Sequence, residues 1–178
     1  MFNQTVRKNL LTRVFAAVVF AAVILVVSSG PIFGQTTDDV SVTVTLQNVS
    51  VTVSDGTVAY GTLGTSAQED TTSNGINDSQ TATNNGNVTA DFNIRGSDTA
   101  AWTLEAAPGA DQYSHEFCTS NCDASPTWND LDTPAYNTLS SGVTASSSQV
   151  FDLQISTPTS TSSFLEQQAD VTVQAVAS

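Results

Sequence analysis

A chain of 178 residues, 39% of them hydrophobic, has enough length and apolar content for one domain with a core of ordinary size. Three of its four basic residues precede residue 14, so from residue 35 onward Arg95 stands against all 17 acidic residues, a formal charge of −16. Such a charge repels the phosphates of nucleic acids and anionic lipids, which excludes a nucleic-acid-binding protein.

The N-terminal segment has the pattern of an export signal. Basic residues at positions 7–13 precede an unbroken apolar run at residues 14–27, and small residues follow at positions 28–31. This order predicts a signal helix and a signal peptide over residues 1–34, which leaves residues 35–178 as a single domain outside the cytoplasm, secreted or at the cell surface. An uncleaved N-terminal membrane anchor is the alternative.

Two valine-rich strands are expected directly after the leader. In residues 40–46 and 49–53, apolar side chains alternate with serine and threonine, and the alternation changes parity at Gln47-Asn48. The apolar side chains of the first segment are Val40, Val42, Val44 and Leu46. A change of parity indicates a bulge or a crossing between sheets. Asp55-Gly56 then predicts a tight turn into a further strand at residues 57–63.

The middle of the chain combines a polar loop with a predicted hairpin. Residues 64–79 contain few apolar side chains and read as a surface loop. Residues 80–83 and 88–95 alternate and flank Asn85-Gly86, which is the dipeptide that type I′ hairpin turns prefer.

The remaining chain continues the short-strand pattern. Further strands are predicted at residues 101–106, 112–118, 136–139, 151–155 and 171–175, with a short run around Trp128 and a helical turn at 164–168. Many short strands separated by Gly, Pro, Asn and Ser predict an all-β fold, a two-sheet antiparallel β-sandwich of immunoglobulin-like or jelly-roll-like form.

Three short stretches resemble known secreted families. Residues 84–92, which read NNGNVTADF, resemble the hairpin common in immunoglobulin-like bacterial and archaeal surface domains. Trp102-Thr103-Leu104, and the strand at residues 170–173 after Pro158, resemble the secreted WxL-type and camelysin-like β-sandwich families. Those families are associated with the cell wall or build extracellular fibres and matrix, which implies a surface structural protein. The second Trp-x-Leu of the WxL pattern is missing near the C-terminus, so the resemblance does not extend to peptidoglycan attachment.

The pattern of titratable residues argues against an enzyme. His115 is the one histidine, and no serine lies in a nucleophile-elbow motif. We interpret His115 as a surface or rim residue and the acidic residues as a solvated face. Cys118 and Cys122, close together in an exported chain, predict a disulfide, with free thiols as the alternative.

Two further sites are possible binding sites. A loop rich in carboxylate and amide oxygens is a candidate calcium site, although such residues also favour turns. Its residues are Glu69, Asp70, Asn74, Asn77 and Asp78. Trp128, between polar neighbours, is either a loop-packing residue or a stacking platform for a sugar, whereas Trp102 alternates in phase with Leu104 and is expected in the core.

Two functions follow as hypotheses. The first is a non-catalytic subunit of a surface layer, fibre or matrix, in which residues 40–46 add as a strand to a neighbouring sheet, so that the partner is another copy or another surface component. The alternative is a secreted module that binds carbohydrate or another ligand, assisted by calcium, through Asp70–Asp78 or Trp128. Under either hypothesis the membrane is a partner only through an uncleaved N-terminal segment.

Overall fold

All regular structure in residues 37–178, the part of the chain that the computed structural model describes, is β-strand. The predicted signal peptide at 1–34 lies outside these residues. The strands are β1 (Val51–Ser54), β2 (Gln68–Asp70), β3 (Gln80–Asn84), β4 (Ala90–Arg95), β5 (Thr103–Leu104), β6 (Gln112–Cys118), β7 (Asn129–Asp130), β8 (Asn137–Val143), β9 (Ser148–Ser156) and β10 (Thr172–Ala177). Within the described part, no helix is long and apolar enough to cross a membrane.

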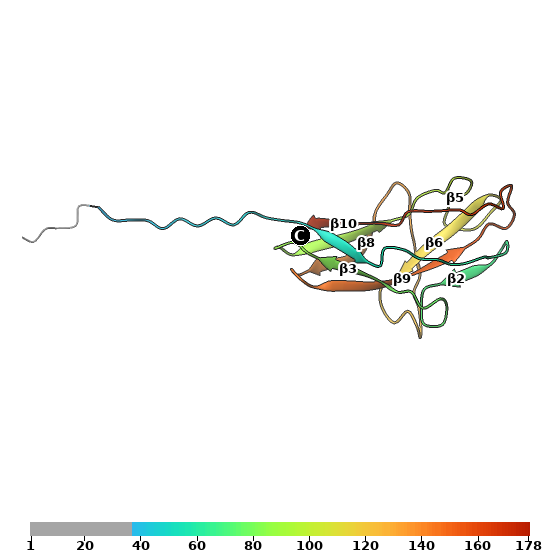
Figure 1. Cartoon of the computed structure of the whole chain (residues 1–178), viewed down its shortest axis with the longest axis horizontal. Coiled ribbons are helices and arrows are strands. Elements are labelled where there is room, and N and C mark those ends of the chain that lie inside the picture. The colour runs from blue at the N-terminus through green and yellow to red at the C-terminus, as the bar shows by residue number, and fades with distance from the viewer. Residues whose placement is uncertain (1–36) are drawn as a thin grey trace, which may run out of the picture. The chain divides into compact units, whose positions relative to one another are not determined.

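The strands form two sheets (Figure 1). The larger sheet has seven strands in the order β1-β3-β9-β6-β5, with β2 also paired to β9 and β7 to β6, and it curls into a half-barrel. The smaller sheet has three strands in the order β10-β4-β8. Every strand pair is antiparallel except β5 with β6, which is parallel. The predicted all-β, two-sheet architecture is therefore confirmed, and the antiparallel prediction is wrong at this one pair.

The core lies between the sheets and follows the period-two pattern of the sequence. Phe92 and Ile94 of β4 are fully buried, and Phe151 and Leu153 of β9 are nearly so. On β4 the neighbours of these residues, such as Asn93, are more exposed, whereas on β9 both Asp152 and Gln154 are buried as well. A buried aromatic or branched aliphatic side chain contributes about 1.5–3 kcal/mol, so on β4 the alternating positions determine which face turns inward.

The predicted hairpin at Asn85-Gly86 is wrong, because β3 and β4 belong to different sheets. Asn84 is fully buried, and its side-chain Nδ2 donates to the carbonyl oxygens of Val88 and Val143, at 2.9 and 2.8 Å. Gly86 lies against Asn48, whose carbonyl oxygen is 2.4 Å from the position that a Cβ would occupy. The Asn-Gly sequence thus serves a crossover between sheets, in which glycine permits close backbone approach rather than a type I′ turn.

Other predicted elements also differ. Residues 40–46 and 57–63 form no strand, and no helical turn occurs at 164–168. The predicted surface loop at 64–79 contains β2, and its Thr71 side chain is fully buried, where its hydroxyl donates to Asp152 at 2.9 Å. Asp152 is itself buried, so not every acidic residue lies on a solvated face.

Candidate functional site: a groove between two edge strands

The two sheets are not closed along one side. β1 is an edge of the larger sheet, because it pairs only with β3, and β10 is an edge of the smaller sheet, because it pairs only with β4. The two edge strands contact each other where they form regular structure. Beyond that contact the chain leaves β1 through Asp55-Gly56, both with positive φ, and it approaches β10 through residues 166–171.

Both segments that continue these edges have an unpaired backbone. Within the described residues, no backbone N–H or C=O from Val58 to Leu63 hydrogen-bonds to another residue. The same is true of the backbone from Glu166 to Ala169, and the next N–H, that of Asp170, donates to the Ser97 hydroxyl at 2.8 Å. Side chains nevertheless alternate along both segments, with Val58 and Tyr60 on one side and Ala169 and Val171 on the other turned toward the core. These are extended segments without strand partners.

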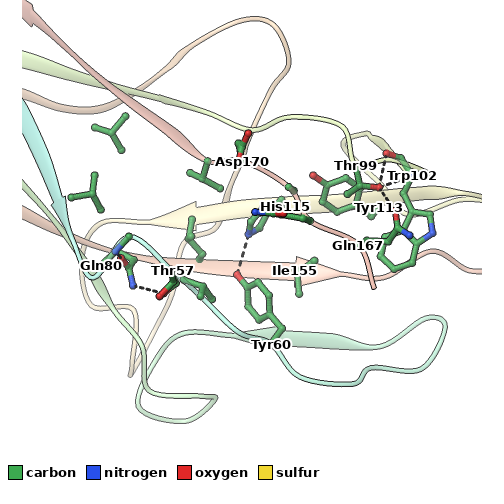
Figure 2. Close-up of a pocket in the computed structure, with 18 of the residues that line it drawn as sticks. Thr57, Tyr60, Gln80, Thr99, Trp102, Tyr113, His115, Ile155, Gln167 and Asp170 are labelled. Carbon is green, nitrogen blue, oxygen red and sulfur yellow. Dashed lines mark hydrogen bonds between the residues drawn. The ribbon is translucent and has the colours of Figure 1, made fainter. Parts of the chain in front are cut away.

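A groove of about 500 Å³ lies between the two segments. Figure 2 shows Tyr60 approaching it from one side and Asp170 from the other, with His115 and Ile155 on the strands between them. The apolar lining comes from β1, β9, β10 and the two flanking segments: Val53, Val58, Phe151, Leu153, Ile155, Ala169, Val171 and Val173. Thr99, Trp102 and Gln167 lie at one end, where Gln167 Oε1 accepts hydrogen bonds from Thr99 Oγ1 and from the backbone N–H of Ala101. A groove with apolar and polar lining and two unpaired backbone edges is suited to accept an extended peptide.

A buried tyrosine–histidine pair forms part of the groove wall. Tyr60 Oη lies 3.0 Å from His115 Nε2, and the two rings meet edge to face. His115 is only 5% exposed, and its Nδ1 has no hydrogen-bond partner among the described residues. Burial lowers the pKa of His115 to about 4, and burial, followed by the nearby Asp70 and Asp78, raises that of Tyr60. The pair is neutral at pH 7, and the prediction of a surface or rim histidine is wrong because position 115 faces inward on β6.

Burial of His115 predicts acid sensitivity. The pKa rises from about 4 in the folded chain to 6.5 in the unfolded chain, so the unfolded state binds more protons between these values. The stability that neutral His115 provides is complete above pH 6.5 and is lost as the pH falls toward 4, by about 3 kcal/mol in total. Urea unfolding at pH 7 and pH 4.5 measures this loss, and His115→Gln should remove most of the difference. An equal pH dependence in the variant would contradict the assignment.

The predicted strand-addition segment is exposed and unpaired. Val40, Val42, Val44 and Leu46 are 83–87% exposed, the highest values among the large aliphatic side chains described. The chain is fixed only where this segment ends: Asn87 Nδ2 donates to the Leu46 carbonyl and Asn87 Oδ1 accepts from the Asn48 N–H, both at 2.8 Å. The structure thus shows regularly spaced apolar side chains that form no strand and are largely exposed in the part of the chain that is described.

The candidate calcium residues make loop contacts instead of converging. Asp70 Oδ1 accepts hydrogen bonds from Thr72 Oγ1 and N–H at 2.6 and 3.0 Å, and Asn74 Nδ2 donates to the carbonyl oxygen of Asp123 at 2.6 Å. Glu69 Oε1 accepts from the Asp70 N–H, Asp78 Oδ1 accepts from Gln80, and Asn77 has a positive φ. Within residues 37–178, no three or more His, Cys, Asp or Glu side chains are grouped to hold a metal ion. Calcium binding stays a prediction.

The predicted disulfide is confirmed. Cys118 and Cys122 are bonded, with their Cα atoms 5.9 Å apart, and the bond closes a short loop after β6. The adjacent Asp123 accepts hydrogen bonds from the Ser73 hydroxyl and N–H, both at 2.7 Å, and these bonds lower the pKa of its carboxyl. The disulfide loop and the loop at residues 70–79 are thereby held together.

The tryptophans lie in different environments. Trp102 packs against the core as expected, and its Nε1 donates to Thr161 at 2.8 Å beside the groove. Trp128 is half-buried just before β7, where it lines a second, shallower and more polar hollow.

Sequence reasoning did not find the groove. One feature of the sequence points to the groove: residues 57–63 alternate like a strand, but no neighbouring segment of the sequence has a strand pattern that could pair with them. Comparison of the chain with protein-family models, with curated proteins and with solved structures finds no match in any of the three.

Proposed function

We propose that the protein is a non-catalytic subunit of an extracellular fibre, layer or matrix, and that copies join when residues 40–46 of one copy enter the groove of another. The observation that carries this proposal is complementarity within one chain: a groove with two unpaired backbone edges, and a segment whose valines alternate, are exposed and have an unpaired backbone from residue 40 to residue 45 among the described residues. A strand placed between the edges would satisfy their N–H and C=O groups on both sides, which is the physical basis of strand addition.

The side-chain pattern of the segment fits such a position. Val40, Val42, Val44 and Leu46 would turn toward the apolar lining, where each fully buried side chain contributes about 1.5–3 kcal/mol before the cost of ordering the segment. Ser41, Thr43 and Thr45 would face solvent. This contact joins two different surfaces, so it is heterologous, and repeated without ring closure it generates a filament.

We further infer that the two sheets, once joined by an added strand, form a β-sandwich of the immunoglobulin-like or jelly-roll-like class. The proposal places the protein outside the cytoplasm, which agrees with the basic, apolar and small-residue order of the leader and with a disulfide at Cys118–Cys122.

Light scattering and negative-stain imaging of the exported chain, with and without calcium, test this function. Filaments or sheets whose mass grows with protein concentration are the expected result. A clean monomer at high concentration in both conditions would reject the building-block role. Assembly that requires calcium would direct attention to the loop at 69–78.

Assembly should also depend on salt. The described residues carry a formal charge of −16, so two approaching copies repel each other. Raising NaCl from 10 to 150 mM shortens the Debye length from about 30 to about 8 Å, and we expect assembly to accelerate by about tenfold. Turbidity or light-scattering traces measure the rate, with a neutral osmolyte of equal osmolality as control. A rate that falls with salt would show that attraction between charges drives the contact.

A further inference from the structure

We propose that the hollow beside Trp128 binds an amino-bearing saccharide, that is, a chain of glucosamine-like units with protonated amino groups. The inference is independent of the groove, because no residue lines both the hollow and the groove. It also gives a role to the acidic side chains around β7 that the building-block function does not use.

The hollow combines an aromatic ring with unengaged polar groups. It measures about 540 Å³, and its lining is Phe117, Thr119, Trp128, Asn129, Asp130, Asp132, Asn137 and Thr138. The Asn137 amide donates to the Asp130 carbonyl at 2.6 Å, which fixes β8 against β7 at its edge. In the described part of the chain, the carboxylates of Asp130 and Asp132 and the hydroxyl of Thr138 make no hydrogen bond. A ring face beside hydroxyl, amide and carboxylate groups suits a sugar, which presents an apolar face and a rim of hydroxyls.

The carboxylates around β7 have no basic partner among the described residues, and Glu116, which does not line the hollow itself, adds to their charge. Glu116 of β6 lies directly opposite Asp130 of β7, and like charges in this position destabilise a sheet. Burial and the Asp130 charge raise the pKa of the Glu116 carboxyl. Arg95, the one basic residue described, instead stacks on the Tyr136 ring at 4.8 Å and donates to the Pro134 carbonyl oxygen at 3.3 Å. A cation supplied from outside would relieve this repulsion.

Trp128 is held in place next to these carboxylates. The side-chain amide of Gln154 lies between Trp128 and Glu116. When its oxygen faces the indole, this oxygen accepts a hydrogen bond from Trp128 Nε1 at 3.3 Å, and its nitrogen donates to Glu116 Oε2 at 3.2 Å. A tryptophan face attracts an ammonium group, and carboxylates strengthen that attraction. The combination favours a protonated amino sugar over a neutral or an anionic one.

The test is titration of the exported chain with a glucosamine hexamer, followed by calorimetry and by the Trp128 indole N–H signal in NMR spectra. We expect binding that shifts this signal and that weakens by about tenfold in Trp128→Ala and in Asp130→Asn, as loss of a cation–π or charge contact implies. Trp128→Phe should retain most of the binding. Glu105→Gln, which removes the same charge at an exposed position that lines neither the hollow nor the groove, should leave it unchanged, and circular dichroism checks that each variant is folded.

Three outcomes would overturn the proposal. Equal binding of an N-acetylglucosamine hexamer would show that the amino group is not recognised. The second outcome is a hexalysine peptide that binds as tightly as the glucosamine hexamer and binds the parent chain and the variants equally. That result would show that the net charge of the protein alone causes the attraction. Binding that is the same in Trp128→Ala and in the parent chain would place the contact elsewhere. None of these results bears on whether the groove accepts a strand.

Discussion

Replacing Val40, Val42 and Val44 together by aspartate is expected to abolish assembly and to leave the folded domain intact. These side chains are about 85% exposed and belong to no strand, so their loss removes little packing among residues 37–178. In a neighbour's groove, each aspartate would meet apolar lining and would cost several kcal/mol as an unpaired charge. Electron microscopy should show no filaments, and the thermal unfolding midpoint should change little.

The matched control places the same three charges on the other face. Ser41→Asp, Thr43→Asp and Thr45→Asp alter net charge and solubility equally, but these positions face solvent when the segment is inserted, so assembly should persist. If both triple variants fail alike, charge repulsion explains the loss. If the valine variant still assembles, residues 40–46 are not the joining segment.

The second large effect is expected in the acceptor. Val171→Asp puts a carboxylate on the groove wall, where Val171 packs against the core cluster. A synthetic peptide of residues 38–46 should bind an assembly-deficient chain, and Val171→Asp should weaken that binding by at least about 100-fold, since an unpaired charge buried at an interface costs about 3–5 kcal/mol. Calorimetry or fluorescence anisotropy of the labelled peptide measures the change.

A control for this variant lies on the adjoining strand. Val176 of β10 is 45% exposed and does not line the groove, so Val176→Asp should bind the peptide like the parent chain. Mixing the triple-aspartate donor variant with Val171→Asp gives a further check. The first retains only the acceptor and the second only the donor, so the mixture should stop at one-to-one dimers. Filaments in that mixture would contradict the proposed pairing.

Much of the fold follows from local patterning. The alternation of Phe92 and Ile94 with polar residues predicts the buried face of β4, because burial of apolar area outweighs other terms at these positions. On β9 the pattern predicts the burial of Phe151 and Leu153 but not that of Asp152 and Gln154. The partners of each strand do not follow from the same pattern. The predicted hairpin at Asn85-Gly86 fails because the buried Asn84 amide bonds to Val143, a contact 59 residues distant that turn propensity cannot represent.

The strand-addition segment stays a prediction, and the groove was not predicted from the sequence. Residues 40–46 alternate like a strand, but they form no strand and have no strand partner in the described part of the chain. The groove depends on how β1 and β10 are spaced, and these strands lie at opposite ends of the domain sequence. Local sequence patterns therefore do not predict it. The prediction for His115 was wrong because a polar residue between Ser114 and Glu116 resembles a surface position, although it alternates in phase with Tyr113 and Phe117, which are buried.

The anchoring of Asn48 by Asn87 has a consequence for how growth proceeds. To occupy its own groove, the segment before β1 would have to double back over residues 47–50, but Asn48 and Ser50 accept backbone hydrogen bonds from Asn87 and Asn85, both at 3.0 Å. If copies join as we propose, self-sealing would be disfavoured, and each copy would act as a bifunctional AB monomer that does not close on itself. In step growth of this kind the mean chain length rises with monomer concentration, and one-ended additives act as chain stoppers. A short peptide of residues 38–46 should therefore set filament length by its molar ratio to protein.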